Sequence, residues 1–188
     1  MERLQLTYTV IGCDGLKSRV RAAVLDPDDP SARAHYAHES AYRCLIDMDK
    51  AYPVLGDVAR TVLLWTGNGA HIGTYPVANF KYLNVAAFVR DYDWPDEGEQ
   101  VVEGNLKDIV TSFAEFGPAI QDLIKILPEK QSRWGMFDSL DHPLSTYAYG
   151  SVVLAGDAAH CSTPHHGYGK MHYMLHSGRR AANKVSRC

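Results

Sequence analysis

Residues 151–169 read Ser-Val-Val-Leu-Ala-Gly-Asp-Ala-Ala-His-Cys-Ser-Thr-Pro-His-His-Gly-Tyr-Gly, and this stretch decides the fold. The apolar run at residues 152–155 is short enough for one buried strand, which ends at Gly156 and Asp157. A strand that ends in this way presents a carboxylate at the carboxyl edge of a sheet, where open α/β sheets bind ligands. Gly167 and Gly169 lack Cβ atoms, so backbone N–H groups there have room to approach a planar or anionic ligand.

A second stretch, residues 10–21, reads Val-Ile-Gly-Cys-Asp-Gly-Leu-Lys-Ser-Arg-Val-Arg. Its apolar start predicts a strand at residues 8–11, and the spacing of apolar side chains after it predicts a helix at residues 16–25. Asp14 stands between the two, and its carboxylate is suited to accept a hydrogen bond from an N–H group at the start of that helix.

The two stretches, in this order, resemble the two FAD-binding motifs of the aromatic-ring flavoprotein monooxygenases. Residues 10–21 resemble the family's Asp-Gly motif, and residues 151–169 resemble its Gly-Asp motif. Residues 42–45, 74–77 and 134–138 are similar to the family as well, and the closest branch is that of salicylate hydroxylase.

This resemblance implies that the cofactors are FAD and NAD(P)H, and that the reaction is hydroxylation of a phenolic or aromatic-acid small molecule by dioxygen. Asp14, Gly15 and Arg21 would help to hold FAD and guide the nicotinamide cofactor. Asp157, after Gly156, would bind the ribityl hydroxyl groups. The residues implied to lie beside the flavin ring are Pro164, Gly167 and Gly169.

The middle of the chain predicts a mainly antiparallel sheet, which would form the floor of a substrate domain. Expected strands are residues 40–48, 61–66, 70–77, 82–89 and 133–137, with Asn68-Gly69 as a hairpin turn. Two amphipathic helices are expected at residues 106–116 and 119–127, with Pro118 in the first turn of the second.

The resemblance implies that the strands bearing His71, Tyr75 and Tyr82 face the substrate, and Arg43 is a further candidate for substrate contact. His71 and Tyr75 are the candidate catalytic residues, because a histidine pKa near neutrality suits a base that acts on a phenol. Arg43 and Tyr82 are the candidate substrate-binding residues, since an arginine can pair with a carboxylate through two hydrogen bonds. Each of the four also has an ordinary interpretation, as a half-buried strand residue or a member of a surface ion pair.

The predicted fold class is α/β, of a mixed α+β kind. Residues 1–30 and 141–188 are expected to form parts of an FAD-binding domain, the latter with a basic tail, and residues 31–140 to form the substrate domain. The chain contains no Gly-x-Gly-x-x-Gly turn, the usual cradle for a dinucleotide pyrophosphate. We therefore expect that roughly the first third of a family member is absent.

Two other functions stay open from the sequence. One is a non-catalytic, degenerate or truncated family member that acts as a binding module. The other is a metal-binding fragment built on the histidine-rich end of the chain, whose candidate ligands are His160, Cys161, His165, His166, His172 and His176.

Composition limits the remaining classes of function. A net charge of −3 argues against a general nucleic-acid binder, and no apolar run reaches the length of a membrane span. The 4 cysteines are widely spaced, which indicates a reduced, cytoplasmic chain. The expected partner is a small aromatic substrate, and the sequence leaves the oligomeric state open.

Overall fold

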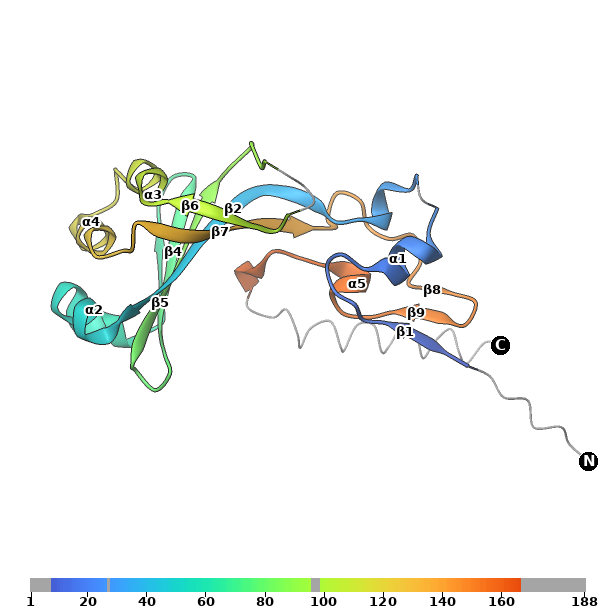
Figure 1. Ribbon diagram of the computed structural model, residues 1–188, viewed down its shortest axis with the longest axis horizontal. Helices are drawn as coiled ribbons and strands as arrows, with labels where there is room; N and C mark the ends of the chain where they lie inside the picture. Colours follow the sequence, from blue (N-terminus) through green and yellow to red (C-terminus); the bar gives the residue numbers. More distant parts are fainter. Residues whose placement is uncertain (1–7, 27, 96–98, 167–188) are drawn as a thin grey trace, which may run out of the picture. The chain divides into compact units, whose positions relative to one another are not determined.

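The computed structural model describes residues 8–26, 28–95 and 99–166 (Figure 1). These residues form two compact units. Unit 1 contains the described residues up to Ala37 and those from Phe137 onward, and unit 2 is His38–Met136. The domain limits expected from the sequence stay predictions. Among the described residues, no helix has the length and apolar character needed to cross a bilayer.

Strands outnumber α-helices in the described chain, as the sequence predicted. In chain order the elements are β1 (Val10–Gly12), α1 (Arg19–Val24), η1 (Pro30–Ala32), β2 (His35–Asp47), α2 (Met48–Leu55), η2 (Gly56–Arg60), β3 (Leu63–Thr66), β4 (Ala70–Val77), β5 (Tyr82–Arg90), β6 (Val101–Asn105), α3 (Leu106–Ser112), α4 (Pro118–Lys125), β7 (Lys130–Asp138), β8 (Ala148–Tyr149), β9 (Val152–Leu154), α5 (Asp157–His160) and η3 (Pro164–His166).

The larger sheet among the described residues has the strand order β3-β4-β5-β2-β7-β6. The pairs β3–β4, β4–β5, β5–β2 and β6–β7 are antiparallel, which confirms the predicted mixed fold with a mainly antiparallel sheet. The predicted hairpin turn is present: the Gly67 N–H donates to the Ala70 carbonyl at 3.0 Å, and Gly69 has a φ of 70°. A glycine adopts that left-handed conformation without a Cβ penalty.

One face of this sheet is covered by the helices of unit 2 (Figure 1). Alternate residues of β4 and β5, such as Ile72 and Val85, pack against Ile109 and Phe113, in and just after α3, and against Leu123 of α4. This alternation follows from the two-residue period of a strand, which sends every second side chain to the same face. The intervening residues therefore lie on the opposite face.

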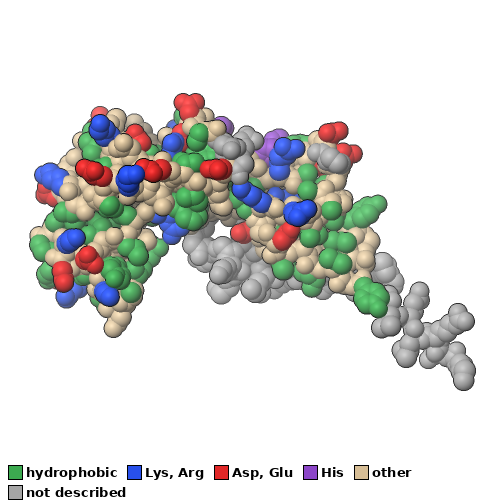
Figure 2. Space-filling view, viewed as in Figure 1, with side chains coloured by type: hydrophobic (Ala, Val, Ile, Leu, Met, Phe, Trp, Pro, Cys, Tyr) green, Lys and Arg blue, Asp and Glu red, His purple; other side chains and the backbone are tan. Residues whose placement is uncertain are grey.

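Unit 1 is organised around two parallel strands from opposite ends of the chain. β1 pairs with β9, and the Ala155 N–H donates to the Gly12 carbonyl at 2.8 Å just beyond the strands. β8 pairs with β9 in antiparallel fashion, and a small core forms around Leu144 and Leu154. Figure 2 shows hydrophobic side chains gathered on the surface over β1 and β9, where Ile11 is 64% exposed.

Unit 2 also contains an ion pair that the sequence did not reveal. Arg133 donates to the Asp91 carboxylate, and both side chains are largely buried. Burial raises the pKa of Asp91, but hydrogen bonds from Arg133, the Asp93 N–H and Ser40 outweigh it, so the net pKa lies below 3.8. The carboxylate is therefore stabilised in its charged form in the folded protein.

We predict that this ion pair makes unit 2 sensitive to acid. A carboxyl group whose pKa is lowered on folding contributes stability above its unfolded pKa, and this contribution is lost as the pH falls below about 4. Urea unfolding followed by tryptophan fluorescence between neutral pH and about pH 3 should show this loss. Asp91→Asn should be less stable at neutral pH, and its free energy of unfolding should change less between neutral pH and acid. An unchanged pH dependence in this variant would show that Asp91 is not the group responsible.

We also predict that Gly12→Ala destabilises unit 1. A Cβ atom at Gly12 would lie 2.7 Å from Val20 Cγ1 and 3.0 Å from Leu154 Cδ2, so helix α1 and strand β9 would have to move apart. Such overpacking costs about 1–3 kcal/mol in the free energy of unfolding. Gly73→Ala is the matched control, because its Cβ would meet nothing closer than the Ala86 carbonyl oxygen at 4.0 Å. Equal urea midpoints for the two variants would contradict the prediction.

Candidate functional site

Asp14 anchors the start of helix α1 from the turn after β1. Its carboxylate accepts hydrogen bonds from Ser18 Oγ at 2.5 Å, the Arg19 N–H at 2.8 Å and the Val20 N–H at 3.3 Å. The bond from Ser18 is the largest cause that lowers the pKa of Asp14. Ser18 itself caps the helix by accepting from the Arg21 N–H at 2.9 Å. The helix therefore begins at Arg19, later than the predicted residue 16.

Arg21 is the most deeply buried charged side chain among the described residues of unit 1, with 1% of its surface exposed. Its guanidinium donates to the carbonyls of Ala32 at 3.1 Å, Asp157 at 3.2 Å, Ala158 at 3.1 Å and Leu16 at 2.5 Å. Arginine has five N–H donors, so these backbone bonds occupy most of them. These bonds position the segment that bears Asp157, and the cofactor role of Arg21 stays a prediction.

The two sequence motifs thus lie side by side, as their resemblance to one cofactor site implied. β1 and β9 are parallel, so Asp14 and Asp157 both follow the carboxyl ends of adjacent strands. Asp157 is exposed and is the first residue of helix α5. Gly156 and Gly15 have φ values of 61° and 84°, and a Cβ at either would meet nothing within 4 Å.

These features fit the sugar-alcohol part of FAD. An exposed carboxylate accepts hydrogen bonds from hydroxyl groups, and bare glycine backbone on either side lets a ligand approach closely. They do not supply a phosphate cradle, because the sequence has no Gly-x-Gly-x-x-Gly turn and the guanidinium of Arg21 is already bonded. Among the described residues of unit 1, the fit to FAD is therefore partial.

The remaining predicted cofactor residues give less information. Pro164 is exposed and begins η3, while Gly167 and Gly169 lie outside the described residues.

Of the predicted metal ligands, His172 and His176 also lie outside the described residues. Burial raises the pKa of the Cys161 thiol, and its Sγ is 3.5 Å from Ser139 Oγ. A buried thiol of this kind is held in the protonated form, which is a poor metal ligand.

The four residues predicted to face the substrate share one face of the unit 2 sheet. Cross-strand partners in an antiparallel sheet point to the same side. His71 pairs with Phe88, Tyr75 with Asn84, and Val77 with Tyr82, while Arg43 pairs with Ala86. All of them alternate with core residues, so they lie opposite the helices. We call this side, defined by Arg43, His71, Tyr75 and Tyr82, the candidate substrate face.

Aromatic contacts give this face a planar surface. The His71 ring stacks on Phe88 with centroids 4.6 Å apart and an interplanar angle of 8°. The Arg43 guanidinium carbon lies 5.5 Å from the centre of the Trp134 ring. Such a cation–π contact holds a positive charge beside an aromatic surface while the side chain stays exposed.

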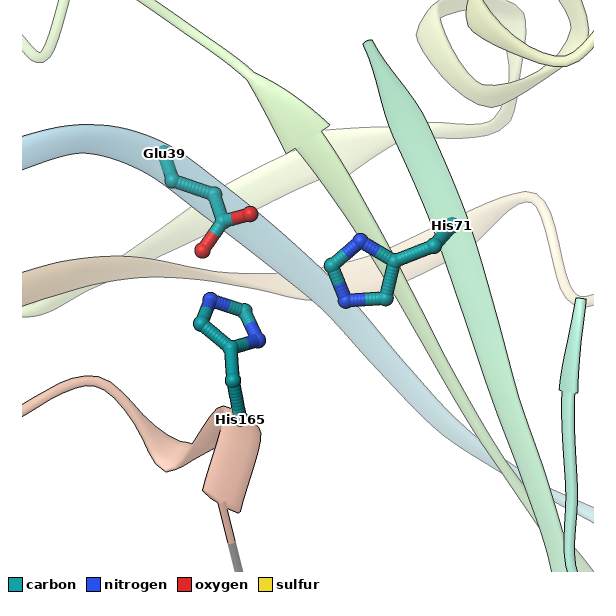
Figure 3. A group of neighbouring side chains, drawn as sticks. All are labelled: Glu39, His71 and His165. Atoms are coloured by element: carbon teal, nitrogen blue, oxygen red, sulfur yellow. The ribbon is translucent and has the colours of Figure 1, made fainter. Parts of the chain in front are cut away.

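Glu39 on β2 points towards His71 on β4 (Figure 3). A carboxylate oxygen of Glu39 and a ring nitrogen of His71 lie within 4.8 Å of each other. His165, drawn in the same figure, belongs to the other unit and is not part of this pair.

A pocket of about 390 Å³ lies elsewhere in unit 2, between the β3–β4 turn and the connection from α3 to α4. Its lining includes Asn68, Thr111 and Phe116 but none of the four predicted substrate residues. Nearby, Gln121 Nε2 donates to the Phe113 carbonyl at 2.6 Å and so ties α4 to the end of α3.

Sequence reasoning missed three residues of the candidate substrate face or its border, Phe88, Asn84 and Glu39. The first two follow from the two-residue period once Tyr82 is assigned to this face, since residues 84, 86 and 88 then share it. Glu39 requires knowledge of where β2 begins, because the predicted strand started one residue later.

Comparison with known proteins gives the family context of this geometry. A family model described as "FAD binding domain" matches residues 2–170. An FAD-dependent monooxygenase, azaH, of Aspergillus niger is 46% identical over 86% of this chain and 38% of its own length. Salicylate hydroxylase asL1 of Sarocladium schorii is 44% identical over 84% of this chain and 33% of its own length.

Solved structures agree with these relatives. A salicylate hydroxylase in a substrate complex superposes with a TM-score of 0.70 at 28% identity, over 86% of this chain and 41% of that chain. HpxO of Klebsiella pneumoniae, complexed with FAD and uric acid, gives a TM-score of 0.63 at 26% identity, over 86% and 38%. The chain therefore spans well under half of the length of the relatives that it matches.

The bonds of Arg21 predict that Arg21→Met destabilises unit 1. The variant would leave the Asp157 and Ala158 carbonyls without donors, at a cost of about 3 kcal/mol in unfolding free energy. Arg19→Met is the control, because Arg19 is exposed two positions earlier on the same helix. Hydrogen exchange at the Ala158 and Ala159 amides should accelerate only in Arg21→Met; equal exchange in both variants would contradict the assignment.

Proposed function

Because the chain belongs to the FAD-binding-domain family, the family of its FAD-dependent monooxygenase relatives, we propose that it contributes to FAD-dependent hydroxylation of a phenolic or aromatic-acid small molecule. Unit 1 would bind the ribityl chain of FAD, and unit 2 would bind the aromatic substrate. The observation that carries this proposal is the parallel pairing of β1 and β9, which places Asp14 and Asp157 at one sheet edge.

On the cofactor side, Asp157 would accept hydrogen bonds from the ribityl hydroxyl groups, and Gly156 and Gly15 would allow close approach. Asp14 and Arg21 would act by fixing the backbone around them. When bound, FAD would supply the oxygen chemistry with NAD(P)H as reductant, while the protein supplies binding, orientation and exclusion of water.

On the substrate side, His71 and Tyr75 would take part in proton transfer from the substrate hydroxyl, with Arg43 and Tyr82 as binding residues. The stack of His71 on Phe88 supports a planar ligand, and the exposed Arg43 supports an anionic or oxygen-rich one. Glu39 lies beside His71 and is a further polar group at this position. We place this activity in the cytoplasm, on the basis of cysteines that are free in the described residues.

A binding module without catalysis is the second candidate function. The observation that favours it is the lack of a Gly-x-Gly-x-x-Gly turn in the 188 residues, which removes the usual pyrophosphate partner. The two candidates differ in one measurable property, the affinity of this chain for FAD.

We predict that the 188-residue chain, purified alone, is colourless and does not oxidise NADPH when FAD is added. The charge-assisted hydrogen bonds of a phosphate cradle are each worth about 1.5–3 kcal/mol, so losing several weakens binding by orders of magnitude. Titration followed by flavin fluorescence checks this. Saturation at low micromolar FAD would contradict the prediction. As a positive control, a longer version of the chain that also contains a Gly-x-Gly-x-x-Gly strand–turn–helix should show bound flavin by its absorbance.

In that longer version, Asp157→Ala is expected to weaken FAD binding roughly tenfold, because the ribityl hydroxyl groups lose a charged acceptor. Asp141→Ala is the matched control, since Asp141 is also an exposed carboxylate of unit 1. If the two variants bound FAD equally well, the proposed role of Asp157 would be wrong.

A further inference from the structure

The candidate substrate face contains a buried amide that the predictions from the sequence did not include. Asn84 on β5 is 8% exposed, and its Nδ2 atom is buried with no hydrogen-bond partner. Its cross-strand neighbours are Leu45 on β2 and Tyr75 on β4. Leu83 and Val85, on either side of it, belong to the hydrophobic core, so Asn84 lies on the opposite face.

An amide in this position destabilises the folded chain. A buried N–H group without a partner loses its hydrogen bonds to water and gains none in return. Asparagine is also disfavoured in strands, and Ala86 and Phe88 show that apolar side chains are accepted at the same face of β5. A buried polar group without a partner needs an explanation. A bound ligand that accepts a hydrogen bond from the Asn84 amide would provide one.

The surroundings define what such a ligand would be. Nδ2 is a hydrogen-bond donor, so its partner has to be an acceptor such as a carbonyl or carboxylate oxygen. Tyr75 lies beside Asn84 in register. The next pair on the same face of these two strands is Gly73 with Ala86, and the one after it is the stacked His71 and Phe88. Gly73 has no side chain, and a Cβ there would meet nothing closer than the Ala86 carbonyl oxygen at 4.0 Å, so this residue does not obstruct a ring that lies between Tyr75 and His71.

We propose that Asn84 is a specificity-determining residue, whose amide N–H donates to a carbonyl-type oxygen attached to the aromatic ring of the substrate. This inference rests on the proposed function, and what it adds is the assignment of Asn84 as the residue that recognises an acceptor on the substrate ring. A ring without that oxygen would leave the amide unpaired after binding, so it would bind more weakly by about one net hydrogen bond.

The test compares two probes of similar size, 2-hydroxyacetophenone, which has a carbonyl acceptor, and 2-ethylphenol, which lacks one. Both are neutral, so the charge of Arg43 does not bias the comparison. Binding to the 188-residue chain without FAD is followed by NMR titration. We expect a preference of about tenfold for 2-hydroxyacetophenone, the equivalent of one net hydrogen bond.

Asn84→Leu, a change of similar shape, should abolish this preference and raise the melting temperature, because the unpaired amide is gone. A purely structural role predicts the opposite change in melting temperature. Asn84→Asp should also lose the preference, since a carboxylate accepts and does not donate. Asn68→Leu, in the exposed β3–β4 turn, is the control and should leave the probe preference unchanged.

Equal binding of the two probes by the unmodified chain, or a preference that survives in Asn84→Leu, would overturn the proposal. A lower melting temperature for Asn84→Leu would do the same. Since the probes are titrated without FAD, a failure here is separate from a failure of the FAD titration, which tests the proposed function itself.

Discussion

The guanidinium of Arg21 is the interaction on which unit 1 depends. Its bonds join the turn before α1, the segment before β2 and the start of α5, which are remote in sequence. A planar group with several fixed donors can satisfy carbonyls in different directions, and a lysine ammonium at this site would not reach them all. Since α1 follows Asp14 and α5 begins at Asp157, one buried side chain sets the spacing of the two cofactor motifs.

The strands of unit 2 could be predicted because their signal is local. The alternation at β4 gave its bounds, and Asn68-Gly69 gave the hairpin. Helix α2 was missed because Pro53 lies inside it, and proline normally interrupts a helical pattern. Strand β6 was missed because Gly104 is unusual in a strand; a Cβ there would lie 2.7 Å from Tyr42 Cε1, so the glycine makes room for that ring.

The candidate site was predictable in its position but not in its chemistry. Period-two alternation is enough to place His71 and Tyr75 on one face, yet it does not say which polar groups have partners. Whether Asn84 is satisfied depends on the register of β2 and β4 against β5, which only the folded sheet defines. The same holds for Arg21, whose bonds to four backbone carbonyls could not be foreseen from the sequence.

The negative charge at the edge of unit 1 suits the hydroxyl groups of FAD and disfavours its phosphates. Asp157 is exposed there, and the carboxylate of Asp14 already accepts the first N–H groups of α1. Two carboxylates suit the hydroxyl groups of a ribityl chain, which are hydrogen-bond donors, and they repel a pyrophosphate. The helix N-terminus that would normally attract a phosphate is therefore occupied from within. The proposed role of unit 1 in binding the uncharged part of the cofactor agrees with this charge, and donors for the phosphates would have to come from residues other than these.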